Sequence, residues 1–347
     1  MRIIMHVDMD SFFTACEERE KPGLKGKPIV VGADPRGGKG RGVVSTCSYE
    51  ARKYGLHSGM PISIAYRKCP GCVFLPVDFE LYEETSVRVM KILKEYADVL
   101  EIGGIDEAFL DVGSLSSFRD AEELARKIKD EIKEKERITC SIGIGPNKLV
   151  AKIASDHQKP DGLTVVAPSK VTDFLWPLGV RKLPGIGPKG EAVLKDLDIL
   201  TIGDLARMTK EQLQELFGKN GEALYELSRG IDKSPVVEFY ETKSIGREYT
   251  FQKDTDSVEE VKKAMAQFLT EIHGDLVEQK FRFKTVTLKI RYGGFETHTH
   301  SLTLKESTDE KAKVGELSER LLEHFLPLKK KVRLIGVRVS NLESEGS

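Results

Sequence analysis

Cysteine is scarce in this sequence, and its placement argues against a disulfide-stabilised class of protein. The five cysteines are an odd number, scattered over a long chain, which speaks against a framework of disulfide bonds. Cys69 and Cys72 have the spacing of a redox motif, but the Pro-Gly pair between them is also simply a turn. No second cysteine pair or histidine cluster completes a zinc site. We therefore predict an ordinary turn at residues 69–72.

Long hydrophobic runs and an excess of charge of one sign are also missing. No stretch approaches the roughly 20 apolar residues that span a bilayer. The acidic residue Asp8 comes too early for a secretory signal. We therefore expect no membrane partner and a cytoplasmic location. The formal net charge of -1 does not point to a nucleic-acid partner, so such a function has to be inferred from local patterns.

The chain has 347 residues, enough for several domains, and its hydrophobic periodicity predicts both helices and strands. The first half reads as β-α-β-β-α-β, the order of a ferredoxin-like unit, interrupted after its first strand by a segment at about 11–78. Ser117 is the expected N-cap of the second helix. The elements are expected, in order, at 2–9, 82–97, 99–103, 107–112, 117–135 and 138–144.

The same order of elements returns near the C-terminus, without shared motif residues. Between the two units, residues 167–230 read as helical, with a hairpin at 182–189 between two helices and a second turn at 217–221. Residues 231–243 lack periodicity and read as a linker. The fold class is therefore α+β with several domains. In the C-terminal unit, strands are expected near 244–251, 283–291, 296–304 and 332–340, and helices near 257–278 and 308–326.

Three acidic residues lie at the ends of predicted strands: Asp8 after the first, and Asp106 with Glu107 at the tight turn between the second and third. In a ferredoxin-like sheet the first strand lies beside the third, so these ends meet. Two carboxylates about 4 Å apart repel by roughly 1–4 kcal/mol, and a pair of Mg²⁺ ions removes that cost. Adjacent strand residues point to opposite faces, so Asp106 and Glu107 share a site only if Gly103-Gly104 bends the chain. From spacing alone, the alternative of ordinary turn acids stays open.

Seven short motifs follow one another along the chain. They are VDMDSFF at 7–13, SYEARKYG at 48–55, GIDEAFLD at 104–111, AKIASD at 151–156, KPDG at 159–162, PGIG at 184–187 and KSIGR at 243–247. Together, and in this order, they resemble the motifs of Y-family (translesion) DNA polymerases, the DinB or DNA polymerase IV branch. Each motif alone is weak, whereas their joint occurrence by chance is very improbable.

The resemblance implies a template-directed DNA polymerase that extends a primer with dNTPs by two-metal-ion nucleotidyl transfer. The resemblance also implies low fidelity and translesion synthesis, and because no exonuclease motif set is apparent, proofreading is not expected. The implied partners are primer–template DNA and dNTPs, and we expect a monomer. The implied domains are a palm (1–10 and 79–166), inserted fingers (11–78), a helix-hairpin-helix thumb (167–230), a linker (231–243) and a little finger or polymerase-associated domain (244–341).

The resemblance also assigns the active site. Asp8, Asp106 and Glu107 are the implied catalytic residues, binding two Mg²⁺ ions with the backbone carbonyl of Met9, and Mn²⁺ is expected to substitute. Tyr49 and Arg52 are three residues apart and share a helix face, where the Arg fork suits phosphate oxygens. Without the resemblance, a lone Arg or Lys here reads as solvated surface charge. The implied nucleotide-binding residues are Ser11, Phe12, Phe13, Thr46, Tyr49, Arg52 and Lys159.

Specificity is implied at two further places. Phe13 falls at the family's sugar gate, where a ring against the deoxyribose leaves no room for a 2′-hydroxyl. Phe12 and Phe13 also read as core aromatics, and we expect one of them to be core. Cys47, Gly59 and Met60 fall where the family covers the nascent base pair with small or slender groups.

DNA-binding residues are expected in two regions. The hairpin with Gly185, Gly187 and Lys189 can present backbone N–H groups to a phosphate, the alternative being a plain helix turn. In the C-terminal unit, one sheet face is expected to carry hydroxyl and cationic side chains suited to contact with a nucleic-acid backbone. The alternative there is an ordinary solvent-facing sheet. The residues expected to bind DNA in this unit are Ser244, Gly246, Arg247, Lys289, Arg291 and Arg338.

Some questions stay open at this level. A sliding clamp is a candidate partner, although no terminal clamp peptide is evident. A helix-hairpin-helix DNA repair nuclease or glycosylase would cut DNA without dNTPs. A non-catalytic DNA-binding scaffold would tolerate the loss of Asp106. Primer extension with dNTPs and Mg²⁺ separates these alternatives.

Overall fold

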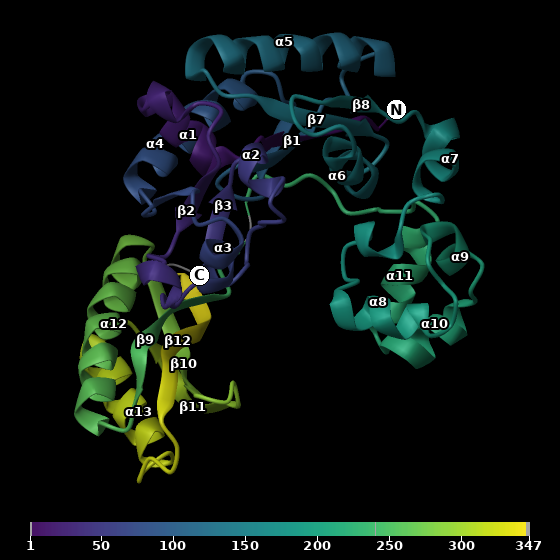
Figure 1. Ribbon diagram of the computed structural model, residues 1–347. Coiled ribbons are helices and arrows are strands. Elements are labelled where there is room, and N and C mark those ends of the chain that lie inside the picture. Colours follow the sequence, from purple (N-terminus) through teal and green to yellow (C-terminus); the bar gives the residue numbers. More distant parts are fainter. Residues whose placement is uncertain (1, 240, 345–347) are drawn as a thin grey trace. The chain divides into compact units, whose positions relative to one another are not determined.

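A computed structural model describes residues 2–239 and 241–344, and the chain divides into two compact units, Met1–Phe239 and Tyr240–Ser347 (Figure 1). Each unit has an apolar core of its own. Both combine helices with mainly antiparallel sheets, so the predicted α+β class is confirmed.

The first unit is built around a five-stranded sheet in the order β5-β6-β1-β7-β8. β1 pairs antiparallel with both β6 and β7, as predicted for a ferredoxin-like unit, and β8 is added parallel to β7. This order brings the end of β1 beside the start of β6. The strands are β1 (Ile4–Met9), β5 (Val99–Ile102), β6 (Glu107–Asp111), β7 (Cys140–Gly145) and β8 (Leu163–Val165).

Helices cover both faces of this sheet, with α5 and α6 on opposite sides (Figure 1). α4 (Phe79–Lys94) and α5 (Phe118–Glu136) pack on the face to which Met5 and Val7 of β1 contribute. α6 (Lys148–His157) lies on the other face, where Ala151 packs with Ile4. Because side chains alternate along a strand, His6 and Asp8 also point to the α6 face.

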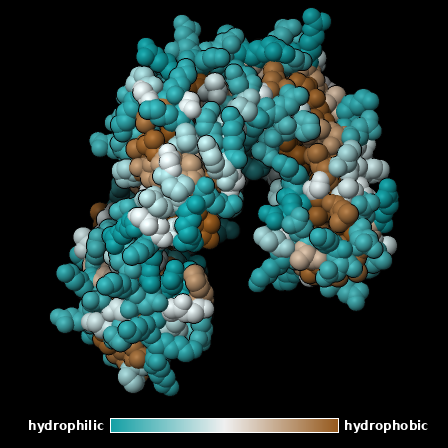
Figure 2. Space-filling model, in the orientation of Figure 1, coloured by the Kyte–Doolittle hydropathy of each residue, from teal (hydrophilic) through white to brown (hydrophobic). Residues whose placement is uncertain are grey.

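Capping residues fix where the two outer helices begin. The Asp78 carboxylate accepts a hydrogen bond from the Leu81 amide at 3.2 Å, so α4 begins at residue 79, earlier than the predicted 82. Ser117 caps α5 as predicted, accepting from the Asp120 amide at 3.1 Å. The outward surface of α5 is hydrophilic in Figure 2, as expected for an amphipathic helix whose other side is buried.

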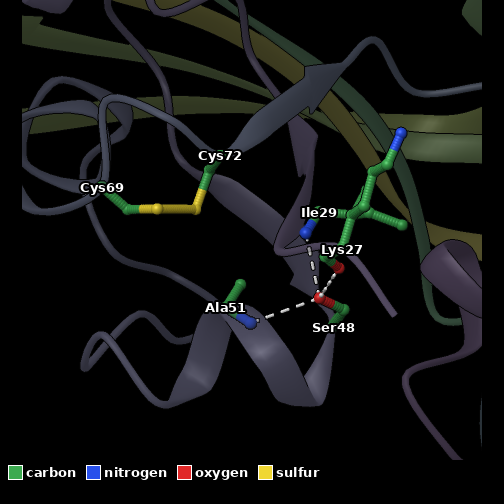
Figure 3. Close-up of a disulfide and its surroundings, with 6 residues drawn as sticks. All are labelled: Lys27, Ile29, Ser48, Ala51, Cys69 and Cys72. Carbon is green, nitrogen blue, oxygen red and sulfur yellow. Dashed lines mark hydrogen bonds between the residues drawn. A yellow bond between two sulfur atoms is a disulfide. The ribbon is translucent and has the colours of Figure 1, made fainter. Parts of the chain in front are cut away.

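The segment after β1 forms a small layer with a three-stranded sheet in the order β3-β2-β4. Its core contains Val30, Val44 and Ile62. In Figure 3, the Ser48 hydroxyl accepts from the amides of Ile29 and Ala51. The elements are α1 (Phe12–Glu20), β2 (Ile29–Gly32), β3 (Val44–Cys47), α2 (Tyr49–Arg52), α3 (Ile62–Lys68) and β4 (Val73–Leu75), with single 3₁₀ turns at Pro22–Leu24 and Arg36–Gly38.

The prediction of an ordinary turn at residues 69–72 was incomplete, because the Cys69 and Cys72 sulfurs form a disulfide (Figure 3). The turn itself is present: α3 ends at Lys68 with Cys69 as its C-cap, and the Cys72 amide donates to the Cys69 carbonyl at 3.1 Å. This turn brings the two Cα atoms to 5.4 Å, within reach of a disulfide. An odd cysteine count therefore excluded a framework of disulfides but not a single local one.

Short helices with a separate core make up most of the region from 167 to 230. The expected hairpin at 182–189 is present, but a 3₁₀ turn (Val180–Lys182) stands where the first of its two helices was predicted. The helices are α7 (Val171–Leu175), α8 (Pro188–Lys195), α9 (Ile202–Ala206), α10 (Lys210–Phe217) and α11 (Asn220–Ser228), with a further 3₁₀ turn at Pro168–Lys170.

Residues 231–239 contain no helix or strand, as the lack of periodicity predicted, yet they are anchored to the palm-like sheet. Val236 is buried among Ile4, Phe109 and Ala151. The buried Glu101 carboxylate accepts from the Val237 amide at 3.0 Å. These contacts hold this stretch against the first unit.

The second unit repeats the element order β-α-β-β-α-β but not the strand order of the first. Its sheet runs β11-β10-β12-β9, so its first strand lies at an edge rather than in the centre. The helices pack on one face of this sheet. The elements are β9 (Ser244–Thr255), α12 (Val258–Glu278), β10 (Phe281–Tyr292), β11 (Thr297–Thr308), α13 (Lys311–Glu323) and β12 (Val332–Ser344).

Candidate active site

The three predicted acids meet where β1 ends and β6 begins. Asp8 is the register partner of Glu107, and the Met9 amide donates to the Asp106 carbonyl at 2.9 Å. Asp106 lies in the bend before β6, where the Gly103 and Gly104 amides both donate to the Glu107 carbonyl. Asp106 therefore lies outside the strand. The alternation of side chains along a strand does not apply to it, so Asp106 and Glu107 can contribute to the same site.

Mutual repulsion is visible at Asp106. Burial, followed by the nearby carboxylates of Asp8 and Glu107, raises the pKa of Asp106 to about 6. A cation between these groups would remove the cost of ionising all three. The protein thus places negative charge where a hard cation can neutralise it.

The pKa of Glu107, unlike that of Asp106, is lowered by its surroundings. A hydrogen bond from His6 and the ammonium group of Lys152 lower the pKa of Glu107 to about 2, against the effect of burial. The His6 Nε2 atom lies 3.2 Å from Glu107 Oε2, and Lys152 pairs with the same oxygen. Burial lowers the pKa of His6 itself.

The side chains present fit a divalent cation. One ligand atom from each of His6, Asp8 and Glu107 lies within 4.8 Å of the others. Carboxylate oxygens are the donors that hard cations such as Mg²⁺ and Mn²⁺ prefer. Asp106 adds a further carboxylate beside this group, because its raised pKa arises partly from Asp8 and Glu107.

Lys159 lies at the same site. Its ammonium group contacts Asp8 Oδ1 at 2.7 Å and approaches Asp156 at 3.8 Å. Asp156 in turn pairs with Lys182 at the start of the hairpin. Lys159, a predicted contact of the triphosphate, is thus a direct neighbour of Asp8, a predicted metal ligand.

The start of α1 supplies the next predicted contacts. Ser11 precedes the helix in a left-handed conformation, and its hydroxyl oxygen is buried without a hydrogen-bond partner among the described residues. Phe12 is core, with 1% of its surface exposed. Phe13 stacks on Tyr82 with ring centroids 4.2 Å apart and is only partly buried. The expectation that one of the two phenylalanines is core is confirmed.

α2 begins at Tyr49 and ends at Arg52, and the two side chains share a face as predicted. The Arg52 guanidinium lies 4.4 Å from the centre of the Tyr49 ring, and its Nε donates to the Cys47 carbonyl at 3.3 Å. Thr46 lies just before them in β3 and is partly buried. Arg52 is exposed, so its guanidinium is accessible to an anion.

The three positions expected to cover a base pair differ in exposure. Cys47 and Met60 belong to the core of the small three-stranded layer, with 1% and 6% of their surfaces exposed. Gly59 has a φ of 81°, and a Cβ there would meet no atom within 4 Å. Only Gly59 therefore offers an open surface.

The predicted hairpin residues lie on an exposed loop around one apolar anchor. Gly185 has a φ of 93°, which favours glycine, and a Cβ on Gly187 would meet nothing within 4 Å. Ile186 between them is buried. Lys189 is exposed in the first turn of α8, so the amides and the ammonium group lie on one accessible segment.

The second unit carries a polar face opposite its helices, as the alternation of β10 and β11 predicted. A groove of about 370 Å³ on it is lined partly by Gly246, Lys289 and Arg338. Arg291 bonds Thr297 across the strand pair at 2.9 Å, and Ser244 is exposed at the start of β9. These residues share the face that the alternation predicted.

Arg247 is placed differently from the other residues expected to bind DNA. Its guanidinium pairs with Glu271 at 3.0 Å and Asp275 at 2.6 Å, both on α12. It pairs in register with Val337, which is buried against the helices. Arg247 thus lines the same groove as Lys289 and Arg338, but its guanidinium is engaged by the two acids of α12.

Asp10 was not singled out from the sequence, although it is central to the site. Its buried carboxylate accepts from Thr139, Ser141 and the Asp161 amide at 2.7–2.8 Å, and from the Tyr49 hydroxyl at 3.4 Å. It thereby ties Tyr49 to the loop that follows Lys159. The Asp-x-Asp spacing from Asp8 was the only available signal.

His6, Lys152 and Ser155 were likewise missed as parts of the site. α6 approaches β7 very closely: a Cβ on Gly143 would lie 2.1 Å from the Ala151 carbonyl oxygen and 2.2 Å from the Ser155 amide. This close approach carries Lys152 and Ser155 over β1. The AKIASD motif contained both residues, but nothing in its spacing showed that they reach His6.

Known proteins match this chain over nearly its whole length. The impB/mucB/samB family matches residues 7–156, the C-terminal domain of that family matches 242–347, and a domain described as the DNA polymerase-iota thumb matches 181–232. The chain is 48% identical to DNA polymerase IV 2 of Methanosarcina mazei, covering 98% of this chain and 92% of that protein. It is 40% identical to DNA polymerase IV of Streptococcus agalactiae, covering 99% and 95%.

Solved structures agree with these matches. A Y-family DNA polymerase chimera, Dbh-Dpo4(243-245)-Dbh, is 34% identical with a TM-score of 0.90 and 99% of each chain covered. An insertion ternary complex of Dbh DNA polymerase is 34% identical with a TM-score of 0.69 and the same coverage. Fold, site and relatives together define a DNA-directed DNA polymerase of the translesion class. The chain belongs to the impB/mucB/samB family, within the Y-family polymerases of the DinB type.

Across residues 2–239 and 241–344, the structure contains no helix both long and apolar enough to traverse a bilayer.

Proposed function

We propose that Asp8, Asp106 and Glu107, with the Met9 carbonyl, bind two Mg²⁺ ions and catalyse transfer of the nucleotidyl group of a dNTP to a primer. In that reaction the primer 3′-oxygen bonds to the α-phosphorus, the bond to the β-phosphate breaks, pyrophosphate leaves and the 3′-hydroxyl loses its proton. A bound cation pair would lower the pKa of that hydroxyl and neutralise charge on the leaving oxygen. The observation that carries the proposal is the convergence of the three acids at the end of β1 and the start of β6, where burial, together with the charges of Asp8 and Glu107, raises the pKa of Asp106 to about 6. Mn²⁺ fits the same oxygen ligands.

Tyr49, Arg52 and Lys159 are proposed to hold the triphosphate, helped by Thr46, Ser11 and the amides of Phe12 and Phe13. Two features support this assignment. The buried Ser11 hydroxyl lacks a partner among the described residues, and it stands at the positive end of α1. The Asp10 carboxylate links the Tyr49 hydroxyl to the loop after Lys159, so the phenol and the ammonium group are positioned together.

Phe13 is proposed to exclude ribonucleotides. Its ring lies flat on Tyr82, at an interplanar angle of 9°, and Tyr82 is itself fixed by a 2.8 Å hydrogen bond to Glu17. A ring held this firmly cannot easily move away from a 2′-hydroxyl. Cys47, Gly59 and Met60 are proposed to lie over the nascent base pair, where the open surface at Gly59 would leave it loosely held and lower fidelity.

DNA is proposed to bind the hairpin residues Gly185, Gly187 and Lys189, and the polar face of the second unit. Exposed amides and cations with no base-reading side chains suit contact with the phosphate backbone. A relative in an insertion ternary complex supports primer–template DNA and an incoming nucleotide as ligands. Monomeric action, a cytoplasmic location and contact with a sliding clamp are further expectations for this chain.

The deciding experiment is primer extension with dNTPs and Mg²⁺, comparing wild type with Asp106→Asn. We expect extension by the wild type and a loss of about 10²–10³-fold in the variant, as for removal of a group that stabilises the transition state. Asp130→Asn, a change at an exposed acid on α5, is the matched control and should extend normally. Cleavage of DNA without dNTPs would instead favour the nuclease alternative, and full activity of Asp106→Asn would overturn the proposal.

A further inference from the structure

His6 is an almost fully buried imidazole beside the carboxylates of Asp8 and Glu107. Only 1% of its surface is exposed, and its ring packs against Phe109 with centroids 4.5 Å apart. Nε2 lies 3.2 Å from Glu107 Oε2, and Nδ1 lies 2.7 Å from the Ser155 hydroxyl. Both ring nitrogens therefore have polar partners, and one of these partners is a carboxylate of the candidate metal site.

The hydrogen-bond partners fix how the imidazole is oriented. A carboxylate oxygen only accepts, so Nε2 carries the hydrogen that is donated to Glu107. The Ser155 hydroxyl has a single hydrogen and lies 2.7 Å from Nδ1 and 2.8 Å from the Lys152 carbonyl oxygen, so in a neutral ring with its hydrogen on Nε2 the hydroxyl donates to Nδ1 in place of that carbonyl. The ring is thus held from α6 on one side and directed at Glu107 on the other.

The two carboxylate oxygens of Glu107 are not equivalent. Oε2 is engaged by His6 and by Lys152. Oε1 makes no hydrogen bond within residues 2–239 and 241–344, and it lies 3.5 Å from the position of a Cβ on Gly103, where glycine leaves open space. One oxygen is therefore restrained while the other is left available.

We propose that His6, oriented by Ser155, is a positioning residue that holds Glu107 so that its second oxygen is presented to the catalytic cation. Carboxylates that bind metals are commonly held by such hydrogen bonds, and their loss costs about 10–100-fold in metal affinity or activity. The inference rests on the proposed role of Glu107 as a metal ligand. It adds a residue from the middle of β1 whose side chain need not touch the cation, the DNA or the nucleotide.

Two substitutions at His6 separate positioning from simple packing. His6→Leu introduces an apolar side chain of similar volume and removes the N–H group directed at Glu107. His6→Gln retains a side-chain N–H donor. We expect His6→Leu to raise the Mg²⁺ concentration for half-maximal primer extension by about 10–100-fold, with the KM for primer–template unchanged. His6→Gln should stay within a few-fold of wild type. His157→Leu, on the exposed side of the same α6, is the control and should behave as wild type.

A second readout requires no turnover. Mn²⁺ binding is measured by electron paramagnetic resonance on the protein with a dideoxy-terminated primer–template and the matching dNTP. His6→Leu should weaken Mn²⁺ binding by about 10–100-fold, and Ser155→Ala should weaken it in the same direction by a smaller factor. If His6→Leu fails to fold by circular dichroism, Ser155→Ala decides the question alone.

The outcomes are separable. A folded His6→Leu protein, or Ser155→Ala where the former does not fold, with wild-type Mg²⁺ dependence and wild-type Mn²⁺ affinity would overturn the role of His6. A wild-type protein that extends no primer would overturn the proposed function, while the Mn²⁺ titration would still test His6. Weakened Mn²⁺ binding in His6→Leu that is restored in His6→Gln supports the inference.

Discussion

Asp106 shows at the scale of one residue how a cluster of carboxylates opposes stability. Its carboxyl group is partly buried beside two other acids, and its pKa is raised to about 6. An unfolded chain would titrate at roughly 3.9. The folded state therefore keeps the proton to higher pH than the unfolded state, and ionisation above that range favours unfolding.

Asp106→Asn is consequently expected to stabilise the protein at pH 7 in the presence of a chelator. In the wild type, the destabilisation caused by ionised Asp106 develops as the pH rises from about 4 to about 6. The difference in melting temperature between the two proteins should therefore vanish near pH 4. After allowing for partial exposure, the gain is about 1–2 kcal/mol. Thermal melts of both proteins across this pH range provide the measurement. A constant difference at all pH values would contradict the assignment, and added Mg²⁺ should raise the melting temperature of the wild type more.

Phe13 is the residue at which sugar selection is expected. Phe13→Ala should increase ribonucleotide incorporation relative to deoxyribonucleotide incorporation by about 10–200-fold, the range for one steric contact in a pocket. Steady-state primer extension with each nucleotide gives the ratio. Phe79→Ala, at an exposed phenylalanine that begins α4, is the control. Unchanged discrimination in Phe13→Ala would show that the stacked pair with Tyr82 is only structural.

α6 is the element that assembles the site, because it carries Lys152 and Ser155 over β1 and leads into Lys159. It can lie so near the sheet only where β7 has no side chain, at Gly143. The motif that contains α6 could be recognised from the sequence, but the contact with His6 joins residues 149 positions apart. Local periodicity carries no information about such a contact.

Gly143→Ala should therefore destabilise the protein by roughly 1–3 kcal/mol or more through overpacking, and should raise the Mg²⁺ requirement by displacing α6. Gly274→Ala is a control that should change the stability in the opposite direction. Gly274 is exposed inside α12 and its Cβ would meet no atom within 4 Å, so alanine should stabilise by about 1 kcal/mol. Denaturant unfolding of both variants tests the pair. Tolerance of Gly143→Ala would show that α6 can move without consequence.

At the scale of the whole molecule, the two units have separate cores and carry separate parts of the proposed function. The first holds the carboxylates and the hairpin, and the second carries a polar groove with Lys289 and Arg338. The element order of the second unit was predicted correctly. The sequence made no prediction of its strand order, in which β9 lies at an edge. Strand order depends on packing between distant segments, which the repeat of element types does not specify.

DNA binding should be salt-dependent in a way that identifies the cationic contacts. Arg338→Ala should reduce the slope of log affinity against log salt concentration by about 1, as expected for the loss of one phosphate contact. Arg247→Ala should change the slope less, because its guanidinium is already paired with Glu271 and Asp275. Fluorescence anisotropy with labelled primer–template over a range of salt concentrations measures both slopes. Equal slopes for the wild type and Arg338→Ala would remove Arg338 from the interface.

The sequence by itself determined which segments become helices and strands, because hydrophobic periodicity and caps such as Ser117 act over a few residues. It marked Asp8, Asp106 and Glu107 as candidate metal ligands through their resemblance to a known family, because spacing alone left ordinary turn acids as an alternative. Only the tertiary structure decided that Asp106 leaves the strand, that Cys69 and Cys72 are bonded, and that His6 and Asp10 support the site. Those features depend on how segments far apart in the chain pack together. Shape complementarity and charge interactions between these segments determine which arrangement has the lowest free energy.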